Sequence, residues 1–149
     1  MATTWIYRQP SSDGSNTTYT YSLWLKRSSL GATERIISNG NQNAAGSKDT
    51  QIVFQADNSI MWDIYNDGAT VGHLETDRVF RDTLGWFHLM FIYNSTSATT
   101  TITGTATDRM QVWVNGVQES ALNTITVPAQ NAEDPSTNDT GYKMRFGSR

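Results

Sequence analysis

The residues with hydrolytic potential are one closely spaced carboxylate pair and two histidines. Retaining glycoside hydrolysis needs two carboxylates about 5 Å apart. The nearest match is Glu75-Thr76-Asp77, whereas Asp63 has no carboxylate two residues away. For Ser-His-Asp chemistry the chain offers only His73 and His88, without a nucleophile elbow of the form Gly-x-Ser-x-Gly. We therefore predict that the protein is not an enzyme and has no catalytic residues.

Metal binding has little support from the residue types. The sequence has no cysteine and its two histidines are far apart, so we expect no zinc site. Calcium binds loop carboxylates, and five aspartates fall in predicted loops: Asp49, Asp57, Asp67, Asp134 and Asp139. They form no ligand string, and the hydrogen bonding of turns accounts for aspartate at such positions. We predict no cofactor, and loop calcium is left open as the alternative.

Tryptophans on one side of the predicted central sheet are the most informative candidates for binding. If Leu89 and Val112 point into a core, the alternating side chains point outward, three tryptophans among them. A large exposed apolar patch marks a binding or packing surface. The predicted contact surface consists of Trp24, Asp63, Tyr65, Trp86, His88, Arg109, Gln111 and Trp113.

Three interpretations of this surface stay open. Long loops could fold back and bury the tryptophans. The rings could instead stack on sugar rings, or contact a neighbouring subunit. His88 stands between Phe87 and Leu89, and a hydrogen-bonded structural histidine is the simplest account of it.

The elements that position these residues are short strands joined by turns. Alternating or continuous apolar patterns predict strands at Thr3–Arg8, Tyr19–Lys26, Arg35–Ser38, Gln51–Gln55, Ser59–Tyr65, Thr70–Thr76, Trp86–Tyr93, Arg109–Asn115 and Tyr142–Phe146. Asn115-Gly116 can supply the positive φ angles of a type I′ turn. Ser95–Asp108 is predicted to be a long exposed connection, or else an extra β-ribbon. The pattern predicts an all-β, two-sheet antiparallel sandwich.

Length and charge limit the domain count and the partners. We expect one domain over residues 1–149, with a net charge of −3 and no basic run, so nucleic acid is not expected as a partner. No stretch approaches the roughly 18 apolar residues of a membrane span. The residues after Met1 lack the charged and apolar regions of a signal peptide.

Three ordered motifs resemble the concanavalin A-like lectin/glucanase superfamily: Tyr19–Arg27, Phe80–His88 and Arg109–Gly116. The resemblance covers about Trp5 to Gly147. It is strongest to laminin-G-like jelly rolls, in the version found in virion proteins of phages and large DNA viruses. It implies a jelly-roll sandwich. Glucanases of this superfamily carry a Glu-x-Asp-x-x-Glu motif. Val79 and Phe80 occupy the positions where a second glutamate could follow, so the resemblance does not imply hydrolysis.

The chain departs from the resembled domains at its C-terminal end. Those domains continue past the position of Tyr142–Arg149 into a further strand that pairs with the N-terminal region. We therefore expect that another chain completes the sheet or that this domain is part of a longer polypeptide. Either would suit an assembled protein, because an unpaired edge strand invites pairing.

The resemblance implies a non-enzymatic virion structural protein: a capsid decoration, a head-fibre module or a tail-fibre module. Its expected partners are other virion proteins, copies of itself and host-cell glycans, and its expected location is the virion. The alternative is a carbohydrate-binding module of a secreted or multidomain protein, located outside the cell.

Overall fold

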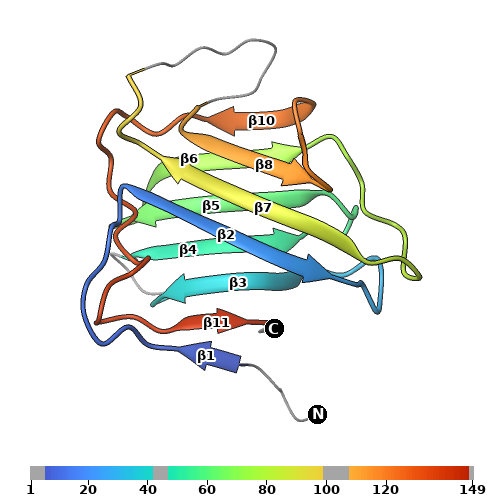
Figure 1. Ribbon diagram of the computed structural model, residues 1–149, viewed down its shortest axis with the longest axis horizontal. Coiled ribbons are helices and arrows are strands. Elements are labelled where there is room, and N and C mark those ends of the chain that lie inside the picture. The colour runs from blue at the N-terminus through green and yellow to red at the C-terminus, as the bar shows by residue number, and fades with distance from the viewer. Residues whose placement is uncertain (1–5, 42–46, 99–107, 148–149) are drawn as a thin grey trace.

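Two antiparallel β-sheets stack face to face in the computed structural model, which describes residues 6–41, 47–98 and 108–147. One sheet has seven strands in the order β1 (Ile6–Arg8), β11 (Met144–Phe146), β3 (Glu34–Gly40), β4 (Asp49–Phe54), β5 (Ile60–Asn66), β6 (Ala69–Thr76) and β10 (Leu122–Thr126). The other has four strands in the order β2 (Thr18–Leu25), β7 (Phe87–Asn94), β8 (Met110–Val114) and β9 (Val117–Gln118). The smaller sheet lies in front of the larger one in Figure 1. The predicted two-sheet sandwich is therefore confirmed.

The core fills the space between the sheets, as the alternation of the strands requires. Trp62 on β5 is fully buried, and its ring lies edge-on to Phe91 of β7 at 5.7 Å between ring centroids. Leu89 and Val112 of the smaller sheet are also fully buried. In β7 and β8, the two predicted central strands, the side chains that point into the core are therefore those that the alternation predicted.

Two tight turns have the chemistry expected from the sequence. Asn115 and Gly116 have φ angles of 50° and 80°, and Asp67 and Gly68 have 51° and 81°. Positive φ at two successive residues matches the right-handed twist of the flanking strands. The predicted β7–β8 pairing is also present, from Leu89↔Val114 to Tyr93↔Met110.

A buried aspartate ties the segment after β10 to both sheets. Asp134 is fully buried and accepts hydrogen bonds from Tyr19 Oη on β2 (2.6 Å) and Thr50 Oγ1 on β4 (2.6 Å). It also accepts the backbone N–H and side-chain hydroxyl of both Ser136 and Thr137. Burial and the negative charge of Asp134 raise the pKa of Tyr19 well above its ordinary value. This aspartate, predicted as a loop carboxylate, therefore has a structural role.

Several strand predictions differ in extent from the structure. The first predicted strand, Thr3–Arg8, is described only over Ile6–Arg8, since residues 3–5 lie outside the described part. Residues 99–107 of the predicted long connection also lie outside it. The sequence analysis missed β10, whose alternation is interrupted by a register shift between Leu122 and Thr124. In the described residues, β11 pairs with β1 through Ile6↔Phe146; the further strand expected beyond Arg149 stays a prediction.

Candidate functional site

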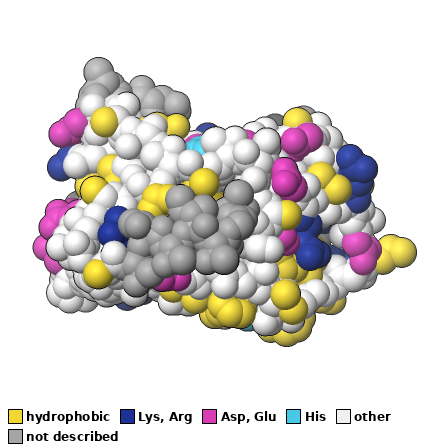
Figure 2. Space-filling view, turned by 90° about the horizontal axis from the view of Figure 1, so that it is seen from above, with side chains coloured by type: hydrophobic (Ala, Val, Ile, Leu, Met, Phe, Trp, Pro, Cys, Tyr) yellow, Lys and Arg dark blue, Asp and Glu magenta, His cyan; other side chains and the backbone are white. Residues whose placement is uncertain are grey.

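Aromatic side chains gather on the outer surface of the four-stranded sheet. We call this set the aromatic face, and it comprises Trp24, Trp86, His88, Met90 and Trp113. Strand pairing sets the arrangement: Trp24 lies opposite His88, and Met90 opposite Trp113. Figure 2 shows hydrophobic side chains gathered along its lower edge, the side on which the four-stranded sheet lies. Strand pairing places Trp24, His88, Met90 and Trp113 on one face, as alternation indicated, and their role as a contact surface stays a prediction.

Two tryptophans of this face are open to solvent. Trp24 is 64% exposed and Trp86 65% exposed. His88 stacks beside Trp24, with 5.3 Å between ring centroids at a 41° tilt, and its Nε2 is hydrogen bonded to Ser22 Oγ at 2.9 Å. A tilted, solvent-facing pair of rings with one polar edge can contact the apolar face of a ring-shaped ligand.

Trp113 is only partly exposed, and its ring is held in place. Its Nε1 donates to Gln111 Oε1 at 2.9 Å. Both side chains come from β8 and lie two residues apart, on the same side of the strand. Gln111 therefore belongs to this face, as predicted, and fixes the orientation of the indole.

A polar groove of about 240 Å³ opens beside Trp86. Its lining combines the Trp86 ring with charged and amide groups: Arg78, Arg81, Asp82 and Asn115, among others. Asn115 Oδ1 accepts the backbone N–H of His88 at 2.9 Å, which binds the β8–β9 turn to β7. The aromatic face and this polar groove therefore meet at Trp86.

Asp82 shapes the loop that leads to Trp86. Its Oδ1 accepts the backbone N–H groups of Leu84 (2.7 Å) and Gly85 (3.0 Å). These two hydrogen bonds hold the pKa of Asp82 below its usual range, so the groove carries a carboxylate that stays ionised in mildly acidic solution. Asp82 and Asn115 were not predicted as site residues. The sequence analysis missed them because aspartate and asparagine are expected in turns even where no ligand binds.

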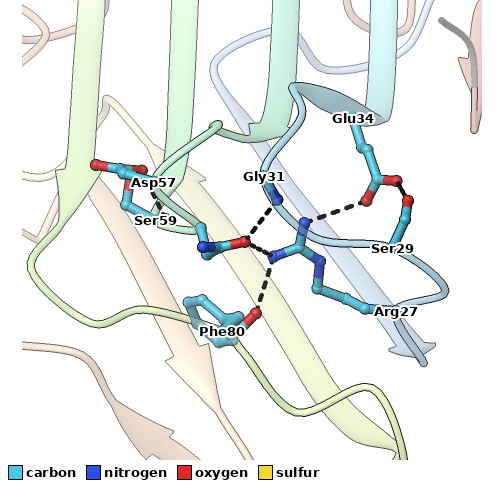
Figure 3. Close-up of polar contacts among 8 residues, drawn as sticks. Arg27, Ser29, Gly31, Glu34, Asp57, Ser59 and Phe80 are labelled. Atoms are coloured by element: carbon cyan, nitrogen blue, oxygen red, sulfur yellow. Dashed lines mark hydrogen bonds and ion pairs between the residues drawn. The ribbon is translucent and has the colours of Figure 1, made fainter.

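A buried arginine anchors the other end of the same loop (Figure 3). Arg27 Nη1 donates to the Phe80 carbonyl oxygen at 2.8 Å and to Asn58 Oδ1 at 2.9 Å, and its guanidinium also pairs with Glu34 at 3.3 Å. The Arg27 guanidinium lies over the Phe54 ring, 4.3 Å from its centroid. The segment between Phe80 and Trp86 is thus fixed at Phe80 and shaped at Asp82.

Three residues of the predicted contact surface lie elsewhere. Asp63 and Tyr65 belong to β5, so they project from the outer surface of the seven-stranded sheet, away from the tryptophans. Asp63 is buried there and paired with His73 Nδ1. Arg109 is buried at the start of β8, where it donates to the carbonyl oxygens of Ser97 and Pro128 at 2.9 Å each. Strand alternation predicts which residues share one side of a strand, but it does not predict to which sheet that strand belongs.

The two acidic residues considered for catalysis, Glu75 and Asp77, lie at the end of β6 among hydrogen bonds that stabilise the fold. Ser59 Oγ donates to Glu75 at 3.5 Å, and Asp77 follows the end of β6, where its backbone N–H donates to the carbonyl oxygen of Ala121. Of the two histidines, His73 pairs with Asp63 while His88 pairs with Ser22 on the other sheet. The two histidines therefore belong to different sheets and do not form one site.

The loop aspartates are likewise dispersed. Asp57 and Asp139 each accept a backbone N–H two residues further along the chain, and Asp67 occupies a turn. Burial raises the pKa of Asp49 on β4. Among the described residues, no group of three or more histidine, aspartate or glutamate side chains could hold a metal ion. Nor does the described part of the chain contain a helix long and apolar enough to cross a membrane.

The architecture and the site define a lectin-type antiparallel β-sandwich. The family model that describes the concanavalin A-like lectin/glucanases superfamily matches residues 3–141, and the chain belongs to this superfamily. No curated protein matches it. Among solved structures, it resembles the native heptameric SAP-like pentraxin from Limulus polyphemus, with a TM-score of 0.54 and 12% identity.

The likeness to the pentraxin covers 94% of this chain and 56% of the pentraxin chain. The chain therefore spans little more than half of that protein. At this level of identity the comparison shows a shared fold, and it carries no information about ligand or assembly. The virion role expected from the sequence stays a prediction, since neither comparison bears on it.

Proposed function

We propose that this protein is a non-catalytic carbohydrate-binding module whose ligand stacks on the aromatic face and reaches into the polar groove. The observation that carries the proposal is the junction at Trp86, where an exposed indole borders a groove lined by Asp82, Arg81 and Asn115. Sugar rings present an apolar face of C–H groups and an edge of hydroxyls. Binding sites for such ligands combine an aromatic platform with a few placed polar groups.

The geometry suggests separate roles for the aromatic and the polar residues in ligand binding. Trp24 and Trp86 offer the ring faces, and His88, which lies beside Trp24, is oriented by Ser22. The Asp82 carboxylate accepts hydrogen bonds from hydroxyls, whereas Arg81 and the Asn115 amide can donate them. The residue set is suited to recognition rather than to cleavage, because Asp82 has no second carboxylate among the residues that line the groove.

Titration with soluble oligosaccharides, followed by tryptophan fluorescence, tests the proposal. We expect saturable binding of at least one neutral oligosaccharide, weakened by about ten-fold or more in Trp86→Ala and Asp82→Ala. Val117→Ala is the matched control, since Val117 is an exposed apolar residue on the same sheet, at the edge formed by β9.

Failure of every tested saccharide class to bind, or equal binding by Trp86→Ala, would refute the proposal. Turnover of laminarin that is abolished by Glu75→Gln would refute its non-catalytic part.

The assembled virion protein predicted from the sequence is the second candidate. The same exposed tryptophans favour it, because aromatic residues also anchor protein interfaces. Sedimentation of Trp113→Ala and Trp24→Ala beside the parent protein distinguishes the two. A loss of assembly with unchanged saccharide binding favours the structural role, and the reverse favours the carbohydrate-binding module.

A further inference from the structure

Large hydrophobic side chains are exposed mainly at one end of the sandwich. This end is formed where β2 and β8 finish and β7 begins, because Leu25 of β2 pairs with Phe87 of β7, and β7 pairs with β8 up to Val114. Apart from residues on β1 and β11, the large hydrophobic residues exposed in the described part of the chain all lie at this end: Trp24, Leu30, Val79, Leu84, Trp86 and Val117. An exposed apolar surface confined to one end of a domain marks a site of interaction.

The connection between β6 and β7 projects furthest at this end. In Figure 1 it reaches beyond the other loops on the right of the view, and Figure 2 shows hydrophobic side chains at the extreme right of the molecule. Leu84 in this connection is 84% exposed, the highest value among the large hydrophobic residues that the structure describes. Trp86, two residues nearer to β7, is also largely exposed. We call residues 82–86 the apolar tip.

Both ends of the apolar tip are fixed to the core. The rings of Phe80 and Phe87, which flank it, are buried and lie 5.5 Å apart between centroids. The backbone N–H of Phe80 donates to the Asn58 carbonyl oxygen at 2.8 Å, and its own carbonyl oxygen accepts a hydrogen bond from Arg27. The chain therefore enters and leaves the tip through positions that the fold holds in place.

The middle of the apolar tip is equally ordered. Asp82 Oδ1 accepts the backbone N–H groups of Leu84 and Gly85. A Cβ atom at Gly85 would lie only 2.5 Å from Asp82 Oδ2, so this close approach requires glycine. A preformed loop loses little conformational entropy when it binds. The fold thus presents Leu84 to a partner in an arrangement that already exists before binding.

The side chains behind the apolar tip are charged. Carboxylates at this end accept hydrogen bonds or form ion pairs within the protein: Glu34, Asp57, Asp82 and Glu119. The cations Lys26 and Arg81 are exposed. Backbone hydrogen bonds and the nearby positive charge of Lys26 lower the pKa of Asp82, which places Lys26 close to the tip. Two exposed cations therefore border the base of the projection.

We propose that the apolar tip inserts into the interfacial layer of a lipid membrane. Leu84 enters the acyl region, Trp86 lies at its boundary, and Lys26 and Arg81 contact lipid phosphates. This order matches the layers of a bilayer, in which tryptophan favours the interface and basic side chains lie near the headgroups. The inference goes beyond carbohydrate binding and does not depend on it, because Leu84 is not among the residues that line the polar groove.

The shape of the tip favours a membrane over a folded protein partner. A stable protein interface involves about 20–30 residues on each side, with closely complementary surfaces. The apolar tip is one projecting loop, and charged residues surround its base. A fluid lipid layer adapts to such a projection, and each apolar group that enters it adds to binding.

Flotation of the protein with phosphatidylcholine vesicles tests the proposal. The vesicles contain no carbohydrate, so the outcome is independent of saccharide binding. We expect saturable partition onto the vesicles, with partial quenching of tryptophan fluorescence by lipids that are brominated on their acyl chains. An excess of soluble glycerophosphocholine should not compete, because the tip contacts the acyl layer rather than one headgroup.

Two variants and one control identify the residues responsible. Leu84→Asp should lower the partition by about ten-fold or more, because a carboxylate at the apex opposes insertion; its urea midpoint and its saccharide binding should equal those of the parent. Lys26→Gln should lower partition by about five-fold on vesicles that contain phosphatidylserine. Ile6→Asp is the matched control, since Ile6 is exposed on β1 at the far edge of the seven-stranded sheet, and it should bind as the parent does.

Equal partition by Leu84→Asp, no saturable partition onto the vesicles, or full competition by glycerophosphocholine overturns the proposal. So does a lipid-free dimer in sedimentation that Leu84→Asp dissociates, because the tip would then be a contact between copies of the chain. Saccharide binding that persists without vesicle binding refutes this inference alone and leaves the carbohydrate-binding module standing.

Discussion

Replacing Asp134 by alanine should destabilise the fold by about 3–5 kcal/mol. The carboxylate is fully buried and accepts six hydrogen bonds from four residues: Tyr19, Thr50, Ser136 and Thr137. A hydrogen bond to a charged group contributes about 1.5–3 kcal/mol. The sum overestimates the loss, because the hydroxyl donors can rotate toward other acceptors. Some buried donors would still be left without a partner, so we expect the loss of unfolding free energy to stay in the range for breaking a buried polar network.

Urea unfolding followed by tryptophan fluorescence measures this loss, with Asp139→Ala as the matched control. Asp139 is a partly exposed loop aspartate whose side chain accepts one backbone N–H, from Gly141, and its removal should cost less than about 1 kcal/mol. A change of under about 1 kcal/mol for Asp134→Ala, with the slope of the transition unchanged, would refute the inference that this carboxylate joins the C-terminal segment to both sheets.

Four further predictions concern the core, the aromatic face, Tyr19 and two glycines. Leu89→Ala should cost about 2–5 kcal/mol in the same assay, because Leu89 is fully buried between the sheets; a neutral result would mean that the faces of β7 are reversed. Trp24→Ala should cost under about 1 kcal/mol, since the ring is largely exposed; a core-sized loss would contradict its placement. The raised pKa of Tyr19 favours its neutral form in the folded state. Stability should therefore be intact below pH 10 and fall above it by up to about 1.4 kcal/mol per pH unit for this group, and Tyr19→Phe should make alkaline urea midpoints fall less steeply. Gly40→Ala should cost more than Gly68→Ala in thermal melts: both have positive φ, but a Cβ at Gly40 would lie 2.0 Å from a backbone oxygen, whereas at Gly68 nothing lies within 4 Å; equal losses would show that φ strain dominates at both.

The alternation along each strand was sufficient to predict the fold class and the two sides of the central strands. Leu89 and Val112 are buried, and Trp24 faces outward, because side chains of a strand project alternately to opposite sides. Turn chemistry was equally local: Asn115 and Gly116 adopt the positive φ angles that a tight hairpin needs. The resemblance to the concanavalin A-like superfamily agreed with this fold class, and the match of the family model shows that the chain belongs to that superfamily.

The composition of the candidate site was predictable only in part. Trp24, Trp86, His88 and their neighbours on the four-stranded sheet share one face because they belong to strands that pair directly. Asp63 satisfied the same alternation rule, yet it lies on the other sheet. The sequence itself determined the pattern within each strand, because alternation depends on local backbone geometry.

Only the tertiary structure decided which strands share a sheet and which groups lose contact with water. Arg109 has the outward position that alternation predicts, but carbonyl oxygens of Ser97 and Pro128, distant in sequence, enclose its guanidinium. Asp134 is buried for the same kind of reason, through donors more than 80 residues away in the chain. Long-range pairing is set by the packing of the whole core, and no short stretch of sequence contains that information.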